Sequence, residues 1–205
     1  EAPSADQCDV GIGARRQRVE YRTRFGKQLR VIRVRYDGRD RSIEIKGNNC
    51  AVVIGPNCRI RRTSLGLTGD NCIIVIGAGT TSEQMTAMAF PSGQSITFGD
   101  DCMISSSVVV RTSDGHSVFD RATKALVNDN ASVTIGAHVW LGNGARVNKG
   151  AIIEEGVIVG QQAIVSGKLD EYSSYGGIPC RLIKSDVVWS RTRKYEKIPE
   201  EFPPG

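Results

Sequence analysis

The fold of this chain is decided by residues 135–170, which read IGAHVW LGNGAR VNKGAI IEEGVI VGQQAI VSGKLD. An aliphatic residue opens each six-residue unit: Ile135, Leu141, Val147, Ile153, Val159 and Val165. The fifth residue of each unit is also apolar and mostly small: Val139, Ala145, Ala151, Val157, Ala163 and Leu169. A period of six matches neither the 3.6-residue period of a helix nor the two-residue alternation of a single strand. It is typical of a parallel β-helix, in which short strands wind into stacked coils.

The physics of such a coil explains these residue types. Three units make a triangular coil, and successive coils stack as parallel strands about 4.8 Å apart. The first residue of each unit then points into the prism and lies on its counterpart one coil away. The spacing predicts three stacked pairs: Ile135 on Ile153, Leu141 on Val159, and Val147 on Val165. The packing argument leaves the hand of the helix open, because right-handed crossovers are the general rule for parallel strands.

The repeat extends toward the N-terminus with less regularity. Six-residue spacing recurs in two shorter runs: Ile54 and Ile60, then Phe98, Ile104 and Val110. Between the runs the register slips twice, which predicts loops near residues 79–94 and 112–132. The sequence therefore predicts three segments: a basic N-terminal β cap (1–42), a β-helix (43–170) and a C-terminal segment (171–205). The cap is expected because a solenoid needs its ends covered.

Charge is concentrated in one part of the chain. The formal net charge is +5, and residues 15–46 hold twelve Lys and Arg against four acidic residues. Such a basic stretch is typical of a face that meets a polyanion. It is equally typical of a solvated sheet edge protected by arginines. The sequence leaves both interpretations open.

Composition narrows the class of protein. The chain has no run of eighteen apolar residues and no apolar stretch after a basic start, so we expect neither a membrane span nor a signal peptide. Its six cysteines form no CxxC pair, which favours reduced thiols in a cytoplasmic protein. Cys58 and Cys102 take the small inner position of their units, so we expect buried apolar side chains there rather than nucleophiles.

Three motifs carry a family resemblance. They are TSDGHSVFD at residues 112–120, IGAHVWLG at 135–142 and YGGIPCRLIK at 175–184. Together with the repeat they resemble the hexapeptide-repeat acyltransferases, and most closely the branch with galactoside, maltose and capsular-polysaccharide O-acetyltransferases. The resemblance implies an all-β, left-handed parallel β-helix. It also implies a homotrimer with active sites between neighbouring prisms and acetyl-CoA as the acyl donor.

By this resemblance His116 is the general base that takes a proton from the acceptor hydroxyl. Histidine suits this role because its ordinary pKa of about 6.5 leaves much of it neutral at pH 7. Asp114 and Asp120 either orient the histidine or cap the loop. Trp140 either donates a hydrogen bond to the oxyanion or packs on the pantetheine arm, and a backbone N–H is an alternative oxyanion donor.

The resemblance also implies a set of residues that border acetyl-CoA: Trp140, Gly142, Asn143, Gly160, Gln161, Ser166, Lys168, Arg181 and Lys184. Small residues let the pantetheine approach the backbone, while the two C-terminal cations meet the phosphates. The chain departs from the family pattern at Gly167, where relatives often carry lysine, and Lys168 is the expected substitute. His138 falls at a turn position that tolerates many residue types, so we expect a structural role.

Other functions of the same fold make different predictions. A γ-class carbonic anhydrase needs three zinc-binding histidines, whereas this chain has two, so no metal is expected. A non-catalytic prism would present the basic stretch to a polyanion, and an N-acyltransferase would use the same base on an amino sugar. The sequence favours an acetyl-CoA-dependent O-acetyltransferase acting on a carbohydrate acceptor. We expect the acceptor to be a sugar hydroxyl of a surface polysaccharide, and the basic N-terminal stretch favours an acidic one. No nucleic-acid partner is expected.

Overall fold

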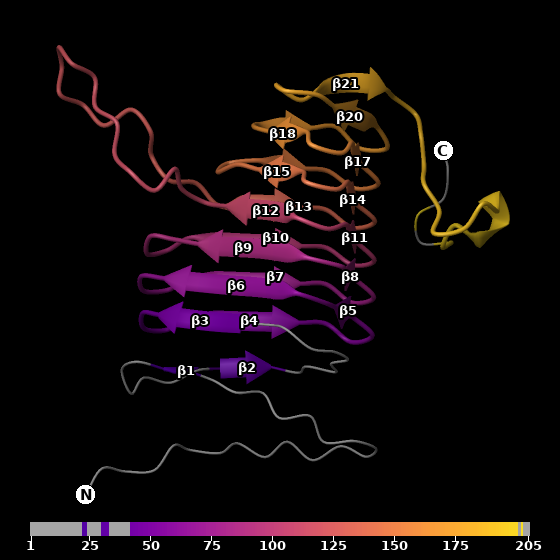
Figure 1. Ribbon diagram of the computed structural model, residues 1–205, viewed down its shortest axis with the longest axis horizontal. Coiled ribbons are helices and arrows are strands. Elements are labelled where there is room, and N and C mark those ends of the chain that lie inside the picture. Colours follow the sequence, from indigo (N-terminus) through magenta and orange to yellow (C-terminus); the bar gives the residue numbers. More distant parts are fainter. Residues whose placement is uncertain (1–21, 24–29, 33–41, 201, 203–205) are drawn as a thin grey trace, which may run out of the picture.

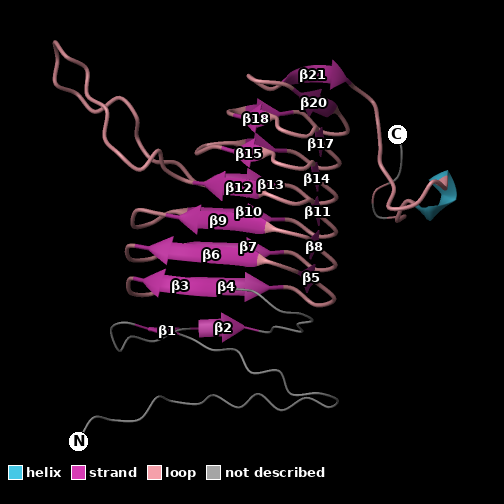
Figure 2. Cartoon of the chain, in the orientation of Figure 1, coloured by secondary structure: helices cyan, strands magenta, loops and turns pink. Residues whose placement is uncertain are grey.

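The computed structural model of the chain describes residues 22–23, 30–32, 42–200 and 202. These residues form three seven-stranded sheets that enclose a triangular prism (Figures 1 and 2). Sheet A stacks β1 (Arg22–Thr23), β3 (Ser42–Lys46), β6 (Thr63–Thr68), β9 (Met85–Ala89), β12 (Val108–Arg111), β15 (Arg146–Val147) and β18 (Ile164–Val165).

The other two sheets follow the same order along the stack. Sheet B holds β2 (Arg30–Ile32), β4 (Ala51–Ile54), β7 (Ile73–Ile76), β10 (Ser95–Phe98), β13 (Val133–Ile135), β16 (Ile152–Ile153) and β19 (Lys168–Leu169). Sheet C holds β5 (Arg59–Ile60), β8 (Thr81–Ser82), β11 (Met103–Ile104), β14 (Trp140–Leu141), β17 (Ile158–Val159), β20 (Ser174–Gly176) and β21 (Arg181–Lys184). A short 3₁₀ helix, η1 (Tyr195–Lys197), follows them.

The predicted fold class and the predicted stacking are confirmed. Ile135 pairs with Ile153, Leu141 with Val159, and Val147 with Val165, all between parallel strands. These six side chains are at most 2% exposed and belong to one apolar core that fills the prism. The six-residue period therefore reports a buried column along each face of the prism.

The N-terminal coils are longer than a six-residue period allows. Leu65 pairs with Ile43 below and Ala87 above, a step of 22 residues, whereas Ile135 and Ile153 are 18 apart. The extra residues lengthen the strands of sheet A, which span five or six residues in β3, β6 and β9 but two in β15 and β18. The loop predicted near 79–94 is thus wrong, because these residues form β8, β9 and the turns beside them.

Residues between β12 and β13 leave the coil. Sheet partners across this gap lie 37 positions apart, as in Ile96 and Val133, instead of 22 or 18. The extra chain forms a long hairpin, closed by an antiparallel bridge between Phe119 and Leu126, that projects away from the prism (Figure 1). We call residues 113–131 the hairpin loop.

The two ends differ from the predicted boundaries. β1 and β2 pair in parallel with β3 and β4, so they continue the coil stack where a separate cap was expected. A strand of a cap and a strand of a coil share the same sequence pattern, and only their pairing distinguishes them. The rest of the predicted cap, and most of the basic stretch at 15–46, lies outside the described residues. At the other end β20 still stacks on β17, and β21 then folds back antiparallel to β20.

Close approach of the coils at the corners explains the apolar residue and glycine that end sheet B strands, as in Ile54-Gly55 and Phe98-Gly99. A Cβ on Gly99 would lie 2.4 Å from the backbone nitrogen of Ala137 in the next coil.

Burial elsewhere in the prism accounts for the inner cysteines. Cys58 and Cys102 are 6% and 0% exposed, and burial raises the pKa of the Cys102 thiol to about 12. These thiols are packing residues, as the sequence predicted.

Gly99→Ala is expected to destabilise the prism by about 1–3 kcal/mol, because neighbouring backbone must move to admit the methyl group. Thermal unfolding measures this as a loss of several degrees in Tm. Gly66→Ala is the matched control, since its Cβ would meet Met88 Cγ at an ordinary 3.7 Å. Equal Tm values for the two variants would contradict the close-packed corner.

Candidate functional site

The hairpin loop presents His116 to solvent. Asn128 ties the two sides of the loop together: its Nδ2 donates to the His116 carbonyl at 2.8 Å and to Asp114 Oδ2 at 3.0 Å. The Asn128 Oδ1 accepts from the backbone N–H of Val118 at 2.7 Å. The imidazole is therefore exposed on a loop whose base is fixed by hydrogen bonds.

Both aspartates near His116 have other partners. The Asp114 carboxylate forms a 2.7 Å ion pair with Lys149, and this contact with that from Asn128 lowers the pKa of Asp114. Asp120 Oδ1 accepts from the backbone N–H groups of Ala122 and Thr123 and from the Thr123 hydroxyl. Asp120 thus caps the hairpin turn, and Asp114 joins the loop to the prism through Lys149. No sequence pattern points to the roles of Asn128 and Lys149.

Trp140 lies on sheet C, away from the corner that carries the hairpin loop. It pairs with Met103 below and Ile158 above, and its neighbour Leu141 points into the core. Strand alternation therefore directs the indole outward, where it is 37% exposed.

The predicted acetyl-CoA residues fall into three groups. Gly142, Asn143, Gly160 and Gln161 stack at the corner between sheets C and A, where a Cβ on Gly142 would lie 2.7 Å from the Gln161 nitrogen. Ser166 and Lys168 lie at the corner between sheets A and B, from which the hairpin loop also leaves. Arg181 and Lys184 are exposed on β21 at the end of the stack.

The polar side chains of the first two groups form different hydrogen bonds and ion pairs. Ser166 Oγ accepts from Asn148 Nδ2 at 3.1 Å, and Lys168 pairs with Glu154 at 3.1 Å. Asn143 Nδ2 donates to the Ser106 carbonyl at 3.2 Å. One chain thus divides the candidate residues between two corners of the prism, with His116 on the loop of one corner and Trp140 beside the other.

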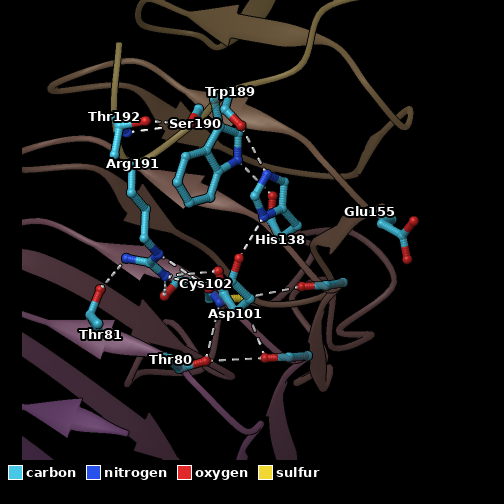
Figure 3. Close-up of polar contacts among 12 residues, drawn as sticks. Thr80, Thr81, Asp101, Cys102, His138, Glu155, Trp189, Ser190, Arg191 and Thr192 are labelled. Carbon is cyan, nitrogen blue, oxygen red and sulfur yellow. Dashed lines mark hydrogen bonds and ion pairs between the residues drawn. The ribbon is translucent and has the colours of Figure 1, made fainter. Parts of the chain in front are cut away.

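A cluster that the sequence did not predict surrounds His138 (Figure 3). It lies beside Trp140, whose ring centroid is 6.1 Å from that of Trp189. His138 is 1% exposed and bonded through both ring nitrogens, to Asp101 and to the Trp189 carbonyl. Arg191 completes the cluster with bonds to Asp101 and to the Thr81 hydroxyl. His138 thus holds the C-terminal segment on the prism, in line with the expected structural role.

Over the described ranges, no group of three or more His, Cys, Asp and Glu side chains is placed to hold a metal ion. No helix in the same part of the chain is long and apolar enough to cross a bilayer.

Comparison with known proteins gives relatives in sequence and in structure, although no protein-family model matches. A polysialic acid O-acetyltransferase of Escherichia coli O1:K1 is 40% identical over 106 residues, which are 52% of this chain. The match covers 34% of that relative, so the chain spans about a third of its length.

Solved structures show the fold. The polysialic acid specific acetyltransferase NeuO superposes with a TM-score of 0.60 at 22% identity, over 82% of this chain and 90% of that one. A galactoside acetyltransferase in complex with coenzyme A gives 0.52 at 23% identity, over 64% of each chain. AntD, an N-acyltransferase in complex with dTDP and 3-hydroxybutyryl-CoA, gives 0.52 at 23%, over 69% and 82%. The resemblance to the hexapeptide-repeat acyltransferases is thus confirmed: the chain has their left-handed β-helix fold, and half of it is related in sequence to a polysialic acid O-acetyltransferase.

Proposed function

We propose that this protein transfers an acetyl group from acetyl-CoA to a sugar hydroxyl of an acidic polysaccharide of the polysialic acid class. The observation that carries the proposal is the exposed His116 on a loop fixed by Asn128, in a chain 40% identical over half its length to an enzyme of that name. The coenzyme A complex of a protein with the same fold supports the choice of donor.

In the proposed reaction His116 works as a proton carrier. One ring nitrogen takes the proton of the acceptor hydroxyl while that oxygen attacks the thioester carbonyl carbon. The tetrahedral intermediate then expels the thiolate, which leaves with the proton from the imidazolium. The products are an acetyl ester and free coenzyme A, and His116 returns to its neutral form.

The active site is proposed to lie between two copies of the chain, in a homotrimer. Support comes from the division of the candidate residues between two corners of one prism, since a cleft between neighbouring prisms unites the two sets. Further support comes from four apolar side chains on the hairpin loop that are 42–60% exposed: Val118, Phe119, Leu126 and Val127. A cluster of this kind is typical of a surface that another protein covers.

Introducing a charge into this cluster is expected to dissociate the assembly. Phe119→Asp combined with Val127→Asp removes apolar contact and buries two carboxylates without partners, so the chain should elute as a monomer. Light scattering coupled to size-exclusion chromatography measures the mass. Arg121→Glu is the control, because it changes charge on the same hairpin without removing apolar area; dissociation in this variant as well would argue against an apolar interface.

The proposed function is tested by thiol release from acetyl-CoA with a panel of acceptors: polysialic acid, a neutral glycan and an amino sugar. Mass spectrometry should find one acetyl group per modified hydroxyl of polysialic acid, and mild base should remove it as an ester. An alkali-stable product on the amino sugar would instead favour N-acyl transfer, the activity named for the structural neighbour AntD. Retention of the glycan with no thiol release would favour a non-catalytic, polyanion-binding prism. Thiol release with the neutral glycan but not with polysialic acid would instead indicate an enzyme that acts on neutral glycans.

A further inference from the structure

The C-terminal segment after β21 runs back along the prism as a strap, defined as residues 187–200 with Phe202. Its first contact is the Val187 N–H, which donates to the Tyr172 carbonyl at 2.8 Å. Arg191 then bonds to Asp101, one coil below His138, and to the Thr81 hydroxyl, two coils below His138 (Figure 3). The strap therefore crosses several coils at the corner between sheets B and C.

His138 occupies an unusual backbone position for its side chain. The corresponding residue of every coil at this corner has a positive φ: Asn57, Gly79, Asp101, His138, Gly156 and Tyr172, with φ between 47° and 69°. Glycine and asparagine adopt this conformation most easily. Asp101 and His138 are neighbours in this column. Both adopt the unfavourable backbone conformation, and the side chains of both bind the strap.

Both ring nitrogens of His138 face hydrogen-bond acceptors. Nδ1 lies 2.8 Å from Asp101 Oδ2, and Nε2 lies 3.0 Å from the Trp189 carbonyl oxygen. A carbonyl oxygen only accepts, and so does an ionised carboxylate. Burial favours a higher pKa for the Asp101 carboxyl, but the hydrogen bonds from His138 and Arg191 hold that pKa below its ordinary value. Both contacts can be hydrogen bonds at the same time only when both ring nitrogens carry hydrogen, as in the imidazolium form.

Aromatic rings enclose this imidazolium. Trp189 stacks on it with centroids 4.1 Å apart and planes 5° apart, and Phe202 stacks at 4.7 Å and 11°. A cation over aromatic faces is stabilised by their quadrupoles. In return the Trp189 Nε1–H donates to the His138 carbonyl at 2.7 Å. Trp189 is thereby held by its ring, its N–H and its carbonyl, and it is only 4% exposed.

The immobilised Trp189 lies against Trp140. Their ring centroids are 6.1 Å apart with the planes tilted by 52°, within the range of favourable aromatic pairs. We propose that Trp189 is a positioning residue for the Trp140 indole, and that the imidazolium form of His138 locks Trp189 in place. The proposal rests on the proposed function in one respect, the role of Trp140 beside the acyl donor.

The lock responds to pH. Loss of a ring proton leaves a nitrogen lone pair facing an acceptor oxygen, so the hold on the strap weakens as pH rises. Two charged groups face the ring here: the Asp101 carboxylate, 2.8 Å from Nδ1, and the Arg191 guanidinium, 2.7 Å from the same carboxylate. The other acids at this corner have different partners: Asp100 accepts from the Ala78 N–H, and Glu155 accepts from the Tyr172 hydroxyl.

The chain has two tryptophans, so each can be observed alone. In Trp140→Phe the remaining Trp189 reports on the lock. We expect its fluorescence to rise as pH is raised from about 5 to about 9, since a stacked imidazolium quenches indole emission and histidine ordinarily titrates in this range. Adding His138→Asn, a residue type that the same corner already accepts at Asn57, should abolish the pH step. Adding Asn57→Gly instead should leave it intact. A step that survives His138→Asn overturns the lock.

In Trp189→Phe the remaining Trp140 reports on its own immobilisation. The reference is the Trp140 contribution to the near-ultraviolet circular dichroism of the wild type, obtained by subtracting the Trp140→Phe spectrum from the wild-type spectrum. Relative to it, we expect the Trp140 signal of Trp189→Phe to fall about twofold or more, because the tilted indole partner is lost. An unchanged Trp140 signal overturns the positioning role. Neither optical measurement requires activity, so failure of the proposed function leaves both results interpretable. In an active enzyme, the thiol-release rate of the wild type relative to that of His138→Asn should decline over the same pH step, because the general base His116 is common to both proteins and its own pH dependence cancels in the ratio.

Discussion

Thiol release from acetyl-CoA is expected to fall by ~10²–10⁴-fold when His116 is replaced by alanine, the range typical of the loss of a general base. The exposed ring and the fixed loop base provide the reason: the His116 side chain is open to solvent, and Asn128 holds its backbone in place through the His116 carbonyl. The decrease should appear in kcat rather than in the KM for acetyl-CoA, because a proton carrier acts in the transition state.

A matched control lies next to His116 in the same loop. Ser117 is exposed as well, so Ser117→Ala tests whether any change in this loop impairs the enzyme. We expect it to retain activity close to that of the wild type. Equal unfolding temperatures for the two variants would show that loss of activity in His116→Ala does not come from unfolding. Wild-type kcat in His116→Ala would end the assignment of the base.

Trp140→Ala is expected to lower kcat/KM for acetyl-CoA by about 10²-fold, the effect of losing one oxyanion donor or a large aromatic contact. The indole is outward-facing on β14 and lies beside Trp189 of the strap. Its truncation leaves Leu141 and the rest of the core unchanged, so the fold should remain stable.

Trp140→Phe separates the two roles that the sequence leaves open. Phenylalanine retains the ring but lacks the N–H donor. If the indole stabilises the oxyanion, kcat falls while the KM for acetyl-CoA changes little; if it packs on the pantetheine arm, most of the affinity remains. Unchanged kcat/KM in Trp140→Ala would remove Trp140 from the site.

The repeat was predictable because its determinants are local in sequence. Each inward residue of 135–170 is followed six positions later by the next, and the stacked partners of Ile135, Leu141 and Val147 were found where that spacing placed them. The 22-residue coils were missed because their extra residues extend regular strands instead of forming turns. Alternating burial in β9, Met85–Ala89, continues the core without a six-residue period.

The surroundings of His138 were not predictable for a different reason. Its acceptors are 37 and 51 positions away in the sequence, so no local pattern connects them. The available signal was chemical: a histidine at a turn position that three of the other five described coils fill with Gly or Asn. The contacts that fix the hairpin loop, from Asn128 and Lys149, likewise depend on where the chain re-enters the coil.

The central claim is that His116 and Trp140 meet in a site shared by two copies of the chain. Mixed oligomers of His116→Ala and Trp140→Ala subunits test it most directly, because a shared site can then combine an intact His116 from one subunit with an intact Trp140 from its neighbour. Random mixing of equal amounts predicts recovery of roughly one quarter of the wild-type thiol-release activity. Mixed oligomers no more active than the two parent variants would place both residues' action within one chain and contradict the account.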